Sequence, residues 1–132
     1  MAKILIVDDD ALMIRMYQTK FKSDGYSVET AADGEECLSK IGSSKPDLVL
    51  LDIMMPKVNG LQVLKKLKSN DETNKIPVVL LSNVGEDNDI NKGLEMGAVA
   101  YLVKASYTPK QVVEKVKEIL AGYKRDIPEV KA

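Results

Sequence analysis

The chain has 132 residues, of which 45% are hydrophobic and 30% are charged, as is typical of a single globular domain. Its 20 acidic and 19 basic residues give a formal net charge of −1, which excludes an electrostatic basis for binding nucleic acid or a membrane surface. Histidine is absent and Cys37 is the only cysteine, so a disulfide framework is excluded and any bound metal must be a hard cation held by oxygens.

The sequence predicts neither a membrane-spanning helix nor a signal peptide. No apolar run approaches the roughly 20 residues that span a bilayer. The N-terminus leads directly into an apolar run and three acidic residues, without the pattern of a signal peptide. We therefore expect a cytoplasmic protein that has no membrane partner.

Five short apolar runs predict the strands of a sheet. The third begins behind Pro46 and is apolar without interruption, which is typical of a strand buried on both faces of a parallel sheet. The second alternates only in part, which favours an edge position. The predicted strands are Lys3 to Val7, Ser27 to Ala32, Leu48 to Leu51, Ile76 to Leu81 and Val99 to Val103.

Helical signals separate these strands. A first helix presents Met13, Met16, Tyr17 and Phe21 on one face, and Gly25 is expected to follow its end. A second helix starts at the N-cap candidate Asp33 and ends at residues 42–44, with Cys37 as a packed apolar residue. A third follows the turn signal Asn59-Gly60, and a fourth, poor in apolar residues, covers Glu86 to Met96. The fifth has Thr108 as N-cap, Pro109 at its first position and Gly122 at its end.

Strands that alternate with helices indicate a parallel sheet with helices on both faces. We predict an α/β fold of the flavodoxin-like, doubly wound type, with five helices and five parallel strands in the order 2-1-3-4-5. Residues 1–122 are expected to form this domain, and residues 123–132 a short polar tail.

Polar residues follow four of the predicted strands. Asp8 and Asp9 follow the first, Asp52 the third, Ser82 the fourth and Lys104 the fifth. The carboxyl ends of parallel strands share one edge of a sheet, so these side chains should converge. Clustered carboxylates repel each other, and Mg²⁺ is the oxygen-seeking cation that suits them best. Carboxylate, cation, ammonium and hydroxyl together favour the acceptance of a phosphoryl group.

Simpler interpretations exist for each of these residues taken alone. Asp52 would only cap a turn, the acids from Asp8 to Asp10 would only begin a helix, and Ser82 and Lys104 would be a turn residue and a solvated lysine. All of these interpretations would have to hold together at a single sheet edge, which favours the functional interpretation.

The chain also resembles the receiver domain of two-component response regulators from about Lys3 to Gly122. The motifs that carry the resemblance are Asp8-Asp9, the run from Asp52 to Gly60, Ser82, and the run from Gly97 to Lys104. The predicted strand order, 2-1-3-4-5, also occurs in a member of this family that has the flavodoxin-like fold.

The resemblance implies a phosphoacceptor switch of a phosphorelay. Asp52 would accept a phosphoryl group from the phosphohistidine of a histidine kinase or phosphotransfer protein, assisted by Lys104 and Ser82. The protein would catalyse only its own phosphorylation and dephosphorylation. The resemblance also implies that Mg²⁺ would bind directly to Asp9, Asp52 and the backbone carbonyl of Met54, and mainly through water to Asp8.

Two positions depart from the family pattern. Ala105 follows Lys104 where the family has proline in a cis bond, and we expect a trans bond because a non-proline cis bond costs about 2.5–4 kcal/mol. Asn83 follows Ser82 where the family has a small residue, which bears on access to the phosphoryl group and on its lifetime.

Ser82 and Tyr101 would form the switch pair, and the surface made by the fourth helix, the fifth strand and the fifth helix would contact a downstream protein. The alternative for Tyr101 is an aromatic residue that is simply packed. Two other functions remain open: an interaction module that is never phosphorylated, and a flavin-binding protein. Acids follow the first strand in place of a phosphate-binding loop, which argues against a flavin.

Overall fold

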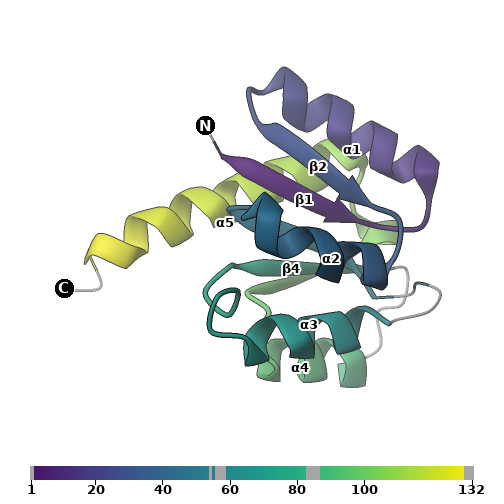
Figure 1. The fold of residues 1–132 in the computed structure, drawn as a ribbon. Coiled ribbons are helices and arrows are strands. Elements are labelled where there is room, and N and C mark those ends of the chain that lie inside the picture. The colour runs from purple at the N-terminus through teal and green to yellow at the C-terminus, as the bar shows by residue number, and fades with distance from the viewer. Residues whose placement is uncertain (1, 54, 56–58, 83–86, 130–132) are drawn as a thin grey trace.

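The computed structural model describes residues 2–53, 55, 59–82 and 87–129, and its centre is a five-stranded parallel sheet (Figure 1). The strand order is β2-β1-β3-β4-β5, so the predicted fold class and topology are confirmed. None of the helices in this described part is long and apolar enough to cross a membrane. The strands are β1 (Lys3–Val7), β2 (Ser27–Ala31), β3 (Leu48–Asp52), β4 (Val78–Ser82) and β5 (Ala100–Val103).

Two apolar cores lie on opposite faces of the sheet because side chains alternate along each strand. One core joins the sheet to α2 and α3, and the other joins it to α1 and α5. Every residue of β3 and β4 is buried, as expected for central strands of a parallel sheet. The helices are α1 (Ala11–Ser23), α2 (Gly34–Ser44), α3 (Gly60–Ser69), α4 (Asp87–Glu95) and α5 (Pro109–Glu129), with a short 3₁₀ turn, η1, at Lys104–Ser106.

Side-chain caps fix where the helices begin. The carboxylate of Asp10 accepts hydrogen bonds from two backbone N–H groups of α1, and that of Asp33 accepts one from Glu36 at the start of α2. Asn59 and Thr108 each form a reciprocal capping pair with the glutamine three residues later. The predicted caps Asp33 and Thr108 are thereby confirmed.

Helix α1 follows the predicted spacing with one exception. Tyr17 and Phe21 are fully buried, but the Met16 side chain is 40% exposed, so its assignment to the buried face was wrong. The row of positions 13, 17 and 21 already covers the sheet, and position 16 falls at the margin of that row. Gly25 follows the helix with a φ of 94°, as its predicted place after the C-terminus requires.

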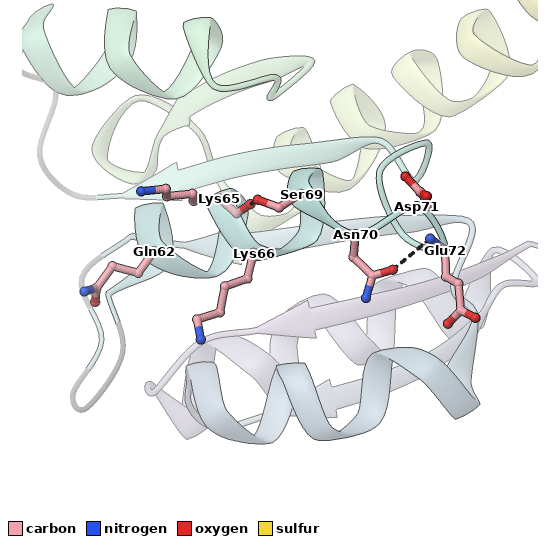
Figure 2. Close-up of a pocket in the computed structure, with 7 residues that line it drawn as sticks. All are labelled: Gln62, Lys65, Lys66, Ser69, Asn70, Asp71 and Glu72. Atoms are coloured by element: carbon pink, nitrogen blue, oxygen red, sulfur yellow. Dashed lines mark hydrogen bonds between the residues drawn. The ribbon is translucent and has the colours of Figure 1, made fainter.

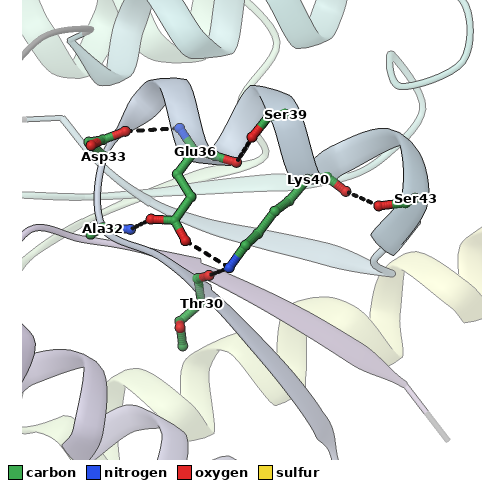
Figure 3. Close-up of polar contacts among 7 residues, drawn as sticks. All are labelled: Thr30, Ala32, Asp33, Glu36, Ser39, Lys40 and Ser43. Carbon is green, nitrogen blue, oxygen red and sulfur yellow. Dashed lines mark hydrogen bonds and ion pairs between the residues drawn. The ribbon is translucent and has the colours of Figure 1, made fainter.

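A polar cluster attaches α2 to the edge strand β2 (Figure 3). The Lys40 ammonium donates a 2.5 Å hydrogen bond to the carbonyl of Thr30 and lies 2.8 Å from a carboxylate oxygen of Glu36. The other oxygen of Glu36 accepts from the backbone N–H of Ala32 at 2.8 Å. These bonds occupy backbone groups beside an edge strand, where unpaired groups invite pairing with another chain.

Helix α5 extends beyond the predicted end. It continues through Gly122 to Glu129 and projects past the sheet, as its yellow end shows in Figure 1. The prediction that Gly122 ends the helix was therefore wrong. A glycine inside a helix costs only about 1 kcal/mol relative to alanine, too little to stop a helix whose buried face is already anchored.

Candidate functional site

The candidate site forms where three strands end at one edge of the sheet. Asp8 follows β1 directly, Asp52 is the last residue of β3, and Lys104 follows β5 directly. Each lies two positions beyond a strand residue that packs in the core shared with α1 and α5. Alternation along the strands therefore directs all three side chains to the same face. The preceding core residues are Ile6, Leu50 and Leu102.

The Lys104 ammonium bridges the two buried carboxylates. Its Nζ lies 2.9 Å from Oδ2 of Asp8 and 3.3 Å from Oδ2 of Asp52. The exposed fractions of these side chains are 10% for Lys104, 2% for Asp8 and 5% for Asp52. Removal from water strengthens the attraction within this trio, so the three side chains hold each other in place.

A third carboxylate completes an acidic group. One carboxylate oxygen from each of Asp8, Asp9 and Asp52 lies within 4.8 Å of the others. Asp9 is exposed, while Oδ2 of Asp8 is buried and makes no hydrogen bond apart from its ion pair with Lys104. A single ammonium cannot neutralise three carboxylates, so the arrangement fits a hard divalent cation.

Asp10 has a different role from its two neighbours. Its carboxylate caps α1, and its backbone N–H donates a 2.9 Å hydrogen bond to Oδ1 of Asp8. The simple interpretation of the acidic run as a helix start thus applies to Asp10. This interpretation does not account for Asp8 and Asp9, because a carboxylate oxygen of each lies within 4.8 Å of one of Asp52.

The electrostatics of the site fix the charge of two groups. Burial lowers the pKa of Lys104, but the hydrogen bond to Asp8 and the charges of Asp52 and Asp8 outweigh burial and leave that pKa above its usual value. Burial, together with the charges of Asp8, Asp52 and Asp10, raises the pKa of Tyr17. Lys104 therefore stays an ammonium at neutral pH, and the Tyr17 hydroxyl stays neutral.

Tyr17 is a neighbour of the site that the sequence reasoning missed. Its helical spacing identified it only as a core residue, yet the charges of two site carboxylates act on its hydroxyl. The available signal was its place on the helix that begins directly after the acidic run.

Ser82 and Tyr101 lie on the neighbouring strands β4 and β5. Ser82 is the last residue of β4 and is fully buried. Tyr101 pairs with Leu80 across β4 and β5, is half-buried, and packs against the core shared with α2 and α3. The structure thus brings Asp8, Asp9, Asp52, Ser82 and Lys104 to this edge, whereas Tyr101 lies within β5, two residues before its end. Met54 and Asn83 lie outside the described residues.

The loop after β5 keeps ordinary backbone geometry. The described residues contain no cis peptide bond, so the expected trans bond between Lys104 and Ala105 is confirmed. The chain then forms the 3₁₀ turn η1, and the N–H of Tyr107 donates to the carbonyl of Lys104.

A separate groove lies along α3 and the turn after it (Figure 2). Its lining is polar and of mixed charge, and none of the clustered carboxylates contributes to it. The lining residues are Gln62, Lys65, Lys66, Ser69, Asn70, Asp71 and Glu72.

Comparison with known proteins identifies the family. The profile of the response regulator receiver domain matches residues 4–117. The chain belongs to this family. Receiver domains are signalling modules of two-component systems, so this chain is the receiver domain of such a response regulator.

Several curated proteins resemble the chain over most of its length. The alkaline phosphatase synthesis transcriptional regulatory protein PhoP of Bacillus subtilis is 41% identical over 118 residues, which is 89% of this chain and 48% of that protein. A homologue of the transcriptional regulatory protein CpxR from Haemophilus influenzae is 40% identical over 91% of this chain and 51% of its own length. The chain therefore spans about half the length of these relatives.

Solved structures agree with the fold. A putative response regulator from Chloroflexus aurantiacus has a TM-score of 0.82 at 34% identity and covers 91% of this chain and 98% of its own. The BeF3-activated receiver domain of DrrB has a TM-score of 0.78 at 31% identity, with 92% and 98% covered.

The crowding of carboxylates predicts the effect of Asp52→Asn on stability. In metal-free buffer at neutral pH, we expect this change to raise the free energy of unfolding by on the order of 1 kcal/mol, because the relieved repulsion exceeds the lost attraction to Lys104. Urea unfolding measures it, and Asp71→Asn, at an exposed carboxylate remote from the cluster, is the matched control that should change little. A loss of stability in Asp52→Asn alone would show that the ion pair dominates.

Proposed function

We propose that this receiver domain is a phosphoacceptor switch in which Asp52 takes a phosphoryl group from a phosphohistidine on a histidine kinase or phosphotransfer protein. One observation carries the proposal. The Asp52 carboxylate is held at a strand end, 3.3 Å from the Lys104 ammonium and within 4.8 Å of two further carboxylate oxygens. This combination provides a nucleophile beside positive charge and a cation site.

The transfer is a displacement at phosphorus. An oxygen of Asp52 forms a bond to phosphorus while the bond from phosphorus to the partner's imidazole nitrogen breaks. The phosphorylated imidazole reacts with its other ring nitrogen protonated, so the departing nitrogen keeps the electron pair and the products are an acyl phosphate on Asp52 and a neutral imidazole. Lys104 offsets the added negative charge, and the Ser82 hydroxyl donates a hydrogen bond to a phosphoryl oxygen.

Mg²⁺ is the cofactor that the carboxylates fit. Asp9 and Asp52 would hold it directly, with Asp8 acting mainly through water; the third direct ligand, the carbonyl of Met54, lies outside the described residues. The oxygens of Asp8, Asp9 and Asp52 lie within 4.8 Å of one another, and the single ammonium of Lys104 cannot neutralise all three carboxylates, which supports a nearby cation. Bound Mg²⁺ supplies charge neutralisation for the phosphoryl oxygens.

The signal leaves through the surface formed by α4, β5 and α5. Movement of Ser82 towards the phosphoryl group frees space for the ring of Tyr101, which is half-buried on the neighbouring strand β5 and pairs with Leu80, two residues before Ser82. Two apolar side chains are already exposed on this side, Leu94 at 43% and Val99 at 40%. Exposed apolar groups of this kind support contact with a downstream protein.

The proposal includes the extent and the activity of the domain. Residues 1–122 form the switch and residues 123–132 a C-terminal tail, of which the structure describes the continuation of α5 to Glu129. The protein acts in the cytoplasm and catalyses only its own phosphorylation and dephosphorylation. The alternative, an interaction module that is never phosphorylated, leaves the buried trio of Asp8, Asp52 and Lys104 without a use.

Phosphorylation at Asp52 is tested with a small donor. Incubation with acetyl phosphate and Mg²⁺ should add the mass of one phosphoryl group to the wild type and to Asp71→Asn. Asp52→Asn should gain none, because an amide is not a nucleophile for this step. Intact-protein mass spectrometry decides the outcome, and an equal gain in Asp52→Asn would contradict the assignment.

The output surface is tested by amide hydrogen exchange with and without beryllofluoride. We expect exchange to change over residues 87–104 in the wild type, because α4 and β5 adjust to the modified Asp52. Residues 27–44, in β2 and α2, should stay unchanged and provide the internal control. If a wild type shown to carry beryllofluoride gives no change over 87–104, the signal leaves elsewhere.

A further inference from the structure

The first residue of α3 lies directly against the backbone of the proposed phosphoacceptor. Gly60 is buried, and its N–H donates a 2.9 Å hydrogen bond to the carbonyl of Ile53. A Cβ placed on Gly60 would come nearest to the carbonyl oxygen of Asp52, and would lie 2.6 Å from Cα of Ile53 and 3.0 Å from the carbonyl carbon of Asp52. Such separations are well inside van der Waals contact, and all three atoms belong to the backbone.

Neither side of this contact can move away freely. Ile53 is 3% exposed, and its N–H donates to the carbonyl of Leu81 on β4 at 3.2 Å. On the other side, Val63 and Leu64 are fully buried against the sheet, and the capping pair at Asn59 fixes the start of α3. A side chain at position 60 must therefore displace either the end of β3 or the first turn of α3.

We propose that Gly60 is a positioning residue for the phosphoryl and Mg²⁺ site. The missing side chain lets α3 seat against the Asp52–Ile53 peptide, and that contact holds the Asp52 carboxylate at its distance from Asp8, Asp9 and Lys104. The inference rests on the proposed function of this site. A methyl group at position 60 shifts the backbone that carries Asp52 and so weakens Mg²⁺ binding and slows phosphorylation.

Other glycines of the chain provide matched controls. A Cβ on Gly93 of α4 would meet the Cδ1 atom of Leu80, the far end of a side chain, and would touch no backbone of the site. Gly42 and Gly122 lie in helices where a Cβ would have nothing within 4 Å. Alanine at Gly42 and Gly122 fills open space and favours the helix. A protein that carries both changes should therefore be more stable, and it can tolerate the crowding that alanine causes at Gly60 or Gly93.

The experiment compares Gly60→Ala with Gly93→Ala, each in a background that carries Gly42→Ala and Gly122→Ala so that both crowded variants stay folded. Urea unfolding gives stability, calorimetric titration with Mg²⁺ alone gives the dissociation constant, and mass spectrometry gives the initial rate of phosphorylation by acetyl phosphate. We expect Gly60→Ala to raise the Mg²⁺ dissociation constant by about tenfold or more, and Gly93→Ala to leave it at the background value.

The outcomes separate this inference from the proposed function. Suppose that the background protein binds Mg²⁺ through Asp52, and that Gly60→Ala binds Mg²⁺ as tightly as Gly93→Ala does. Gly60 then serves only the packing of α3, and the inference is overturned. If Asp52→Asn in the same background binds Mg²⁺ unchanged, the proposed site itself is wrong. Loss of Mg²⁺ affinity in Gly60→Ala at a stability no lower than that of Gly93→Ala supports the positioning role.

Discussion

The ion pairs of Lys104 with Asp8 and Asp52 are the interaction on which the rest of the site depends. They join the ends of three strands that are far apart in sequence, at distances of 2.9 and 3.3 Å. The cluster nevertheless carries an excess of negative charge, because Asp9 adds a third carboxylate to a group that contains one ammonium. The carboxylates therefore outnumber the positive charge, and the Mg²⁺ ion and the phosphoryl group that we propose for this site would both change that imbalance.

The fold supplies the geometry that these ion pairs need. Parallel pairing aligns the carboxyl ends of β1, β3 and β5 at one edge, and alternation turns the three side chains to the face shared with α1 and α5. Local bonds then refine the positions: the backbone N–H of Asp10 holds one oxygen of Asp8, and the first residue of α3 contacts the backbone after β3. A rigid sheet with short connections places each group with little freedom to relax apart.

Sequence patterns predicted most of this arrangement because its determinants are local. Apolar runs and caps identified the strands and helix starts, and the topology rule for parallel sheets then implied the convergence of Asp8, Asp52 and Lys104. The failures arose where tertiary packing decides. The buried face of α5 holds the helix together through Gly122. The charges around Tyr17 and the backbone contact of Gly60 depend on the folded chain, and neither produces a periodic pattern of residues in the sequence.

The most direct test of the account measures the free energy of unfolding as a function of Mg²⁺ concentration. Above the dissociation constant, the wild type should gain about 1.4 kcal/mol per tenfold increase in Mg²⁺, because binding stabilises only the folded chain. Asp9→Asn should lose most of this gain, whereas Asp10→Asn, which changes the residue that caps α1, should keep it. A wild type that gains no stability, or an equal loss in the two variants, would contradict a cation site formed by the clustered carboxylates.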